Sequence, residues 1–206
     1  MHNPERKQHL ESLTGLSHRA LTSALAFARD AGEALYAVDA TAGNGHDTVF
    51  LALEVGENGQ VWTFDVQEAA LTATRERVSL AGPDILRRIF LVHAGHETAK
   101  YRLPVEVREN LRAITFNLGF LPGSDRRVKT TVATTIEALS FLAGILAVGG
   151  VVSVHAYKGH SGGAEEGAAV GRWFTALPWD TWRVAEYTFC NKDRNPETLF
   201  LAEKLG

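Results

Sequence analysis

Two acidic residues frame a glycine-rich turn in the first quarter of the chain. The segment 37–48 reads Ala-Val-Asp-Ala-Thr-Ala-Gly-Asn-Gly-His-Asp-Thr, with Asp39 before the turn and Gly43 and Gly45 within it. A further acid, Asp65, follows about twenty residues after Gly45, the spacing expected of a ribose-binding acid. This order is typical of a turn that holds a nucleotide-like cofactor at the carboxyl end of the first parallel strand of a sheet.

The details of the turn favour S-adenosylmethionine over a nicotinamide dinucleotide. The dinucleotide motif has three glycines, and here Thr48 occupies the third position. Asp39 would repel a diphosphate, whereas it would attract a cationic sulfonium amino acid. Asp65 is expected to accept hydrogen bonds from the ribose hydroxyls, and Gln67 either faces the adenine edge or is simply a polar residue that begins a helix.

Alternating helices and strands must position these residues. The apolar patterns predict strands at 34–39, 60–65, 89–93, 113–117, 151–157, 183–190 and 198–203, and helices at 17–32, 47–53, 67–81, 134–146 and 164–177. Ser17 is the expected N-cap of the first helix. Alternation implies parallel strands with right-handed crossovers, and the last two strands, with no helix between them, imply an antiparallel hairpin. We therefore predict an α/β fold, a doubly wound, mostly parallel, Rossmann-like sheet of seven strands in a single domain, 1–206. Residues 1–33 would form a helical segment packed on its core.

Composition narrows the class of protein. The chain has 206 residues, of which 45% are hydrophobic and 22% charged, which is ordinary for a globular domain. Its one cysteine, Cys190, excludes an internal disulfide and a thiolate metal cluster, and this fits a reducing cytoplasm. No apolar run is long enough for a membrane span, and the formal charge of −3 gives no global attraction to nucleic acid.

A second segment, Asn117-Leu-Gly-Phe120, leaves the predicted strand 113–117 toward the same edge of the sheet. It is similar to the Asn-Pro-Pro-Tyr signature of methyltransferases that modify amino groups. An attacking amine needs its lone pair free, so the site must bind its N–H groups with acceptors, and the Asn117 side-chain oxygen and the Leu118 carbonyl are such acceptors. Phe120 would stack on a planar substrate, and alignment would supply most of the rate if the amine arrives neutral. The alternative is an Asx/Gly turn that ends a buried strand.

Other polar residues leave more than one interpretation. His93 and His155 lie in apolar strands without a cluster of carboxylates or cysteines, so we predict no metal site. The segment 157–166, which contains His160, is either a substrate loop or a plain connector. A basic group (Arg126, Arg127 and Lys129) follows the Asn117 segment, and would either hold phosphates beside the target base or be scattered solvated charge.

Together these features resemble the class I methyltransferase family labelled putative rRNA methylases, which includes tRNA 5-(aminomethyl)uridine methyltransferases. The matching blocks are 39–48 (DATAGNGHDT), 64–67 (FDVQ), 96–97 (HE), 116–125 (FNLGFLPGSD), 159–163 (GHSGG), 165–166 (EE) and 195–196 (NP). The resemblance implies methylation of the aminomethyl group of a modified wobble uridine in tRNA. Two differences concern the substrate side: family members commonly have tyrosine at the position of Phe120, and a more apolar version of the turn 195–198.

The resulting site predictions fall into three groups. Asn117, Leu118 and Phe120 are the predicted catalytic residues. The predicted cofactor-binding residues are Asp39, Gly43, Asn44, Gly45, Asp47, Asp65, Gln67 and His96. The predicted substrate-binding residues are Asp125, Arg126, Arg127, Lys129 and His160, with the tRNA anticodon stem-loop as partner and a homodimer as one way to grip it.

Three other functions stay open at this point. The chain could methylate another RNA or a small amine, because the cofactor half would look the same. It could be a nicotinamide-dependent oxidoreductase, although the absent third glycine argues against this, or a cofactor-binding protein without catalysis.

Overall fold

A computed structural model describes residues 10–30, 32, 34–119, 130–159, 161–194 and 196–206. Within them, one seven-stranded sheet has the order β3-β2-β1-β4-β5-β7-β6. The strands are β1 (Tyr36–Asp39), β2 (Gln60–Asp65), β3 (Ile89–His93), β4 (Leu111–Leu118), β5 (Leu146–Tyr157), β6 (Trp182–Thr188) and β7 (Glu197–Lys204). Strands β1 to β5 pair in parallel, whereas β7 pairs antiparallel with both β5 and β6. The predicted fold class is confirmed.

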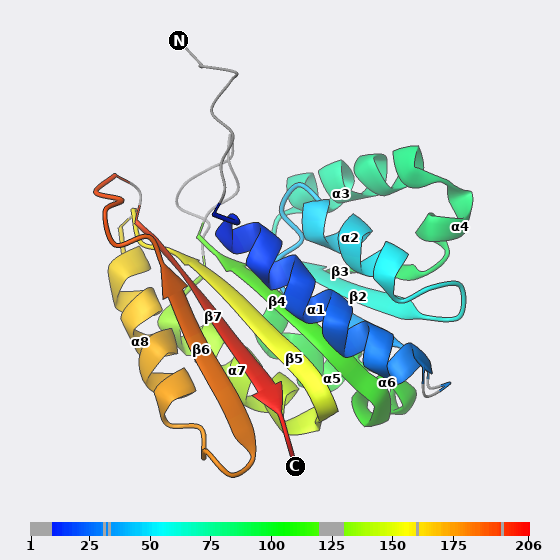
Figure 1. Cartoon of the computed structure of the whole chain (residues 1–206). Helices are drawn as coiled ribbons and strands as arrows, with labels where there is room; N and C mark the ends of the chain where they lie inside the picture. Colours follow the sequence, from blue (N-terminus) through cyan, green and yellow to red (C-terminus); the bar gives the residue numbers. More distant parts are fainter. Residues whose placement is uncertain (1–9, 31, 33, 120–129, 160, 195) are drawn as a thin grey trace.

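Helices cover both faces of the sheet (Figure 1). They are α1 (Leu13–Asp30), α2 (His46–Glu54), α3 (Glu68–Ala81), α4 (Pro83–Leu86), η1 (His96–Thr98), α5 (Ala99–Arg102), α6 (Val105–Asn110), α7 (Val132–Ile145) and α8 (Gly163–Thr175). Helix α1 crosses β4 and β5 on the face that it shares with α2 and α3, while α7 and α8 lie behind the sheet. None of the described helices is long and apolar enough to cross a membrane.

Strand β4 shows how the sequence builds the two layers. It lies at the centre of the sheet, and every residue from Leu111 to Leu118 except Asn117 is buried. Ile114 and Phe116 pack into the core beneath α7, and Ala113 packs into the core beneath α1. Because a central parallel strand is covered on both faces, it reads as a continuous apolar run. The half-buried Asn117, near the carboxyl end of β4, is the exception, and it is one of the predicted site residues.

The structure corrects several predicted boundaries. Helix α1 begins at Leu13, so Ser17 is not its N-cap; Ser17 lies inside the helix, buried, with its Oγ 2.6 Å from Ser153 Oγ. Strand β5 begins at Leu146 and includes Gly149 and Gly150. The sequence predicted the strand only from residue 151, because a glycine pair is typical of the end of a helix. The short helices between 83 and 110 were not predicted, because four to six residues show too little periodicity. The extent of the single domain stays a prediction.

Candidate active site

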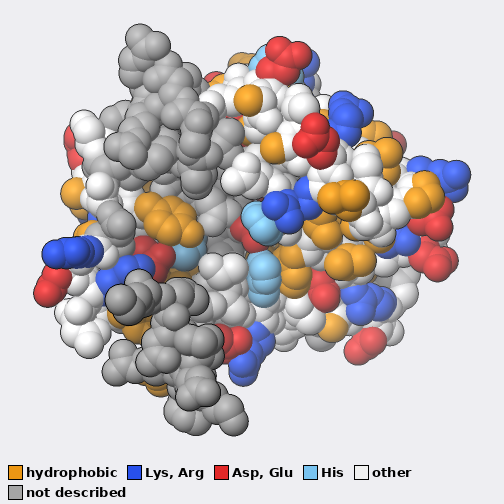
Figure 2. Space-filling view, turned by 90° about the horizontal axis from the view of Figure 1, so that it is seen from above, with side chains coloured by type: hydrophobic (Ala, Val, Ile, Leu, Met, Phe, Trp, Pro, Cys, Tyr) orange, Lys and Arg blue, Asp and Glu red, His pale blue; other side chains and the backbone are white. Residues whose placement is uncertain are grey.

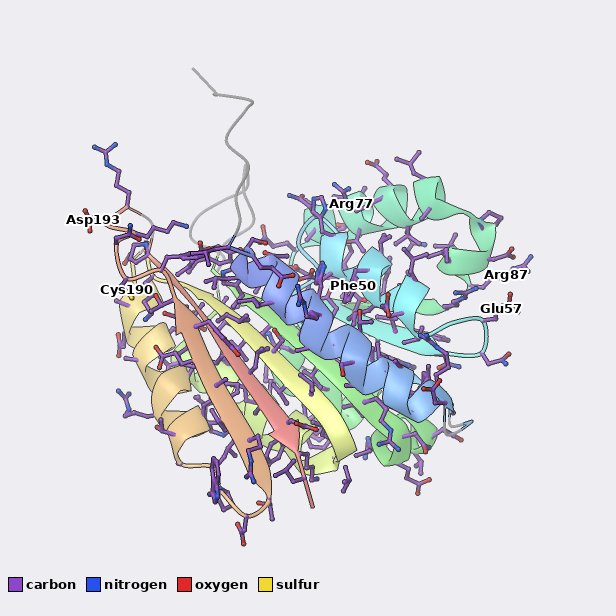
Figure 3. The ribbon with its side chains drawn as sticks, viewed as in Figure 1. Phe50, Glu57, Arg77, Arg87, Cys190 and Asp193 are labelled. Atoms are coloured by element: carbon purple, nitrogen blue, oxygen red, sulfur yellow. The ribbon has the colours of Figure 1, made fainter. Side chains whose placement is uncertain are left out.

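The glycine turn lies at the carboxyl edge of the sheet, between β1 and α2. Gly43 and Gly45 both have positive φ, 53° and 77°, a conformation that side chains with a Cβ rarely adopt. A Cβ on Gly45 would lie 2.8 Å from the Cα of Thr74 in α3. The Nε of Arg77, labelled in Figure 3, donates to the Asn44 carbonyl at 2.5 Å. The turn is therefore fixed against α3 from its outer side.

The buried Asp39 stabilises the same turn by accepting two hydrogen bonds. It is fully buried, accepts a hydrogen bond from the Thr41 amide at 3.1 Å, and accepts one from the Thr48 hydroxyl at 2.6 Å. Burial, and then the charge of Asp47, raise the pKa of Asp39 to about 7 despite these two bonds. Asp39 thus shapes the turn, and a direct contact with a cofactor stays a prediction.

Asp65, at the end of β2, joins the turn to the start of α3. Its two carboxylate oxygens accept from the Gly43 amide at 3.1 Å and from the Gln67 amide at 2.9 Å. A carboxylate has about four lone-pair sites, so acceptor capacity remains for ribose hydroxyls. Gln67 is the N-cap of α3 and is half-buried.

His96 lies directly under the turn and is 6% exposed. Its Nδ1 is 3.0 Å from the Ala40 carbonyl oxygen. Burial lowers the pKa of His96, so the ring is neutral at pH 7, and Nδ1 carries the proton because a carbonyl oxygen only accepts. Nε2 is then a buried acceptor without a hydrogen-bond partner among the described residues. Such an atom is stabilised by a donor, for example an amino group of a bound ligand.

Asn117 is oriented by a chain of side chains from three elements. Its Nδ2 donates to Asp47 Oδ2 at 2.5 Å, and Asp47 Oδ1 lies 2.7 Å from His18 Nε2 of α1. The His18 ring stacks on Phe50 with centroids 3.7 Å apart, and Figure 3 shows Phe50 between α1 and α2. Although burial opposes the ionisation of Asp47, the hydrogen bonds from His18 and Asn117 lower its pKa.

The donor group of Asn117 is therefore engaged, and its side-chain oxygen has no hydrogen-bond partner among the described residues. Sequence reasoning did not identify His18 as part of this arrangement. No local motif surrounds His18, which lies 29 residues before Asp47.

The electrostatics of this edge favour a cation. Asp39, Asp47 and Asp65 are close enough for the charges of the other two to raise the pKa of Asp39. A positively charged ligand relieves this repulsion, whereas a diphosphate adds to it. Figure 2 looks down on this edge, with histidine side chains near its middle. Together with the unpartnered His96 Nε2, the acidic surroundings fit a sulfonium amino acid linked to adenosine.

Several predicted site residues lie outside the described part of the chain. They are Phe120, Asp125, Arg126, Arg127, Lys129 and His160. Their roles stay predictions. Among the described residues, no group of three or more His, Cys, Asp or Glu side chains is arranged to hold a metal ion.

Comparison with known proteins connects this site to a family. The family model described as putative rRNA methylase matches residues 61–203. The chain is 31% identical over 173 residues to the chloroplastic tRNA (mnm(5)s(2)U34)-methyltransferase of Arabidopsis thaliana. This match covers 81% of the chain, and the chain spans 62% of the length of that relative.

Two solved structures are similar over nearly their whole length. A putative rRNA-methylase from Clostridium thermocellum has a TM-score of 0.84 and 31% identity, with 96% of this chain and 100% of that chain covered. A putative methyltransferase from Streptococcus mutans in complex with SAH has a TM-score of 0.79 and 32% identity, with 95% and 99% covered. The glycine turn, Asp65 and Asn117 thus lie in a fold of the same kind.

Proposed function

Because the chain belongs to the family of putative rRNA methylases, we propose that it methylates the aminomethyl group of a modified wobble uridine in tRNA. The resemblance drawn from the sequence is confirmed at the level of the family, and so are the methyltransferase class and S-adenosylmethionine as its cofactor. The identity of the substrate is the part of this proposal that goes beyond the comparisons. It is supported by the name of the Arabidopsis relative and by the way in which Asn117 is held.

The orientation of the Asn117 amide carries the proposal. With Nδ2 donating to Asp47, the side-chain oxygen can accept an N–H of an amine while the amine lone pair stays free. The adjacent Leu118 carbonyl is the second acceptor that we assign. A site of this kind suits an amino nucleophile, whereas a hydroxyl nucleophile would need a base to take its single proton.

The cofactor half of the proposal uses the residues around the glycine turn. Bound S-adenosylmethionine supplies an electrophilic methyl group. Asp65 would hold the ribose, the turn 43–45 and the neighbouring acids would hold the cationic amino-acid part, and His96 Nε2 would accept from a donor of the ligand. Asp39 would act through the shape of the turn.

The test is methyl transfer to defined RNAs. The protein is incubated with labelled S-adenosylmethionine and tRNA from cells that lack the wobble methyl group, and the nucleosides are analysed by mass. Ribosomal RNA and small amines are assayed in parallel. We expect label in the wobble nucleoside of tRNA; label in ribosomal RNA or in a small amine alone would refute the tRNA assignment.

Asn117→Ala separates a catalyst from a binding protein. We expect transfer to fall by at least ~100-fold, the order that loss of one preorganised hydrogen bond to a reacting group causes, with cofactor affinity nearly unchanged. Asn58→Ala is the matched control, because Asn58 is exposed in the turn at the opposite edge of the sheet. Equal activity of Asn117→Ala and the control would remove Asn117 from the mechanism.

The RNA surface is proposed from charge alone. Joint replacement of Arg126, Arg127 and Lys129 by Ala should lower tRNA affinity and reduce the salt dependence of binding, because phosphate contacts release counterions. An unaltered salt slope, measured by binding titrations at several ionic strengths, would place the phosphate-binding surface elsewhere. A homodimer on an anticodon stem-loop stays part of this proposal.

A further inference from the structure

Three polar residues of β5 and β7 lie next to Asn117 on the same face of the sheet. Asn117 is the register partner of His155, and Tyr157 is the register partner of Glu197. Register partners project from the same face, as do residues two apart in one strand. His155, Tyr157 and Glu197 therefore extend the Asn117 site across β5 to β7. The site predictions made from the sequence do not include these three residues.

The contacts of the three side chains show which of their atoms donate hydrogen bonds and which accept them. His155 Nε2 is 3.0 Å from Glu197 Oε2, and Lys192 Nζ donates to the other oxygen of Glu197. Although burial opposes ionisation, these bonds and the charges of His155 and Lys192 lower the pKa of Glu197. An ionised carboxylate only accepts, so Nε2 carries the proton of the neutral ring and Nδ1 presents a lone pair. Tyr157 Oη lies 3.4 Å from that Nδ1, at the long end of hydrogen-bond range.

The solvent exposure of Tyr157 distinguishes these three hydrogen-bonded side chains from a fully buried group with a structural role alone. His155 is 5% exposed, whereas Tyr157 is 39% exposed and its ring stacks on the imidazole with centroids 4.3 Å apart. This series of hydrogen bonds therefore leads from a partly exposed tyrosine, through a buried imidazole, to a carboxylate that a lysine also contacts. A base held by a third group in this way is the arrangement found in nucleophile-activating triads.

The proposed reaction includes a proton transfer that these three side chains could carry out. An alkyl amine is largely protonated at pH 7, as the lysine side chain with a pKa of ~10.4 illustrates, so it has no lone pair for attack. Methylation of the free amine forms a positively charged secondary ammonium again. One proton must therefore leave the substrate before transfer, either to solvent, which leaves little neutral amine at pH 7, or to a base in the site.

We propose that Tyr157, His155 and Glu197 form the relay that removes this proton, an inference that rests on the proposed function. The ammonium passes a proton to the Tyr157 oxygen while the Tyr157 hydroxyl proton moves to His155 Nδ1, and Glu197 stabilises the resulting imidazolium. The neutral amine then forms the new N–C bond as the S–C bond to the methyl group breaks, with its electron pair staying on sulfur. The proton on His155 is afterwards released to solvent.

The charged groups around His155 suit this task. Burial lowers the pKa of His155, the negative charges of Glu197 and of Asp47 in α2 oppose that effect, and Lys192 adds to it. From α1, His18 contacts Asp47. His155 is thus neutral and able to accept a proton at pH 7. Burial, followed by the charges of Glu197 and Asp47, raises the pKa of Tyr157 to about 12, so Tyr157 acts as a hydroxyl that relays a proton rather than as a stored anion.

The pH dependence of kcat tests the relay. Wild type should level off above the pKa of His155. In His155→Gln, kcat at pH 7 should fall by about 100-fold, the scale of general base catalysis, and should then rise tenfold per pH unit as the amine deprotonates by itself. Tyr157→Phe should show the same shape. Glu186→Gln and Tyr187→Phe, exposed on β6, are the matched controls.

The outcomes separate the relay from the proposed function. A loss of kcat that is equal at every pH, or no loss at all, would overturn the relay while leaving the methyltransferase proposal intact. NMR titration of the His155 ring without substrate is the second readout, in which Glu197→Gln should lower its pKa, and an unchanged pKa would also overturn the relay. If wild type transfers no methyl group to any amine, the proposed function fails and the relay fails with it. Tyr157→Phe keeps the test valid if His155→Gln does not fold.

Discussion

Replacing the buried Asp39 by Asn should change how the stability of the protein depends on pH. Burial and the neighbouring charge raise the pKa of Asp39 from 3.8 to about 7, so the folded state holds this proton more tightly than the unfolded chain does. The free energy of unfolding that Asp39 contributes is therefore fully present below about pH 4 and is lost as the pH rises through about 7. The amide side chain of the variant carries no such proton, so this dependence disappears in Asp39→Asn.

The size of the effect follows from the linkage relation. At about 1.4 kcal/mol per pKa unit, a single group with these two pKa values lowers the free energy of unfolding by about 3 kcal/mol between pH 4.5 and pH 8. The local bonds can survive the substitution. The oxygen of the new amide can accept from the Thr41 amide, and the Thr48 hydroxyl can rotate to accept from the new NH₂ group.

Urea unfolding of wild type and Asp39→Asn at intervals between pH 4.5 and 8 measures this difference. Titrating groups that do not interact with Asp39 contribute equally to both proteins, so the difference in free energy isolates Asp39 together with its coupling to Asp47 and Asp65. Asp84→Asn is the control, since its side chain is 77% exposed and pairs only with Arg87 among the described residues. Wild-type and Asp39→Asn profiles that stay parallel within about 0.5 kcal/mol would refute the assignment of a raised pKa to Asp39.

Two more predictions concern the glycine turn. Asp65→Ala should weaken the binding of S-adenosylhomocysteine by ~1.5–3 kcal/mol in calorimetry, the loss expected for hydrogen bonds to a charged group, and an unchanged Kd would contradict the ribose assignment. Gly45→Ala should lower the free energy of unfolding by at least ~2 kcal/mol, because φ is positive and the new Cβ meets the Thr74 backbone. Gly56→Ala, with a φ of 72° and open space around its Cβ, should cost only ~1 kcal/mol, and equal losses would show that packing against Thr74 is unimportant.

The sequence was sufficient for the fold class and for the glycine turn that we propose holds the cofactor. Apolar runs of strand length separated by amphipathic helices indicated parallel pairing, and Gly43 and Gly45 lie at the positive φ that the turn requires. Asp65 and Asn117 stand at the ends of β2 and β4, where the strand pattern placed them. These features are local, because strand alternation and turn chemistry are encoded within a few residues.

Contacts between segments that are distant in the sequence could not be predicted from it. His18 reaches Asp47 only because α1 crosses the sheet above β4 and β5, and Glu197 reaches His155 only because β7 returns antiparallel beside β5. The sequence pattern showed His155 as one histidine in an apolar strand and Glu197 as part of a polar turn. Helix crossing and strand register are fixed by packing over the whole sheet, so only the tertiary structure decides which side chains of neighbouring elements share hydrogen bonds.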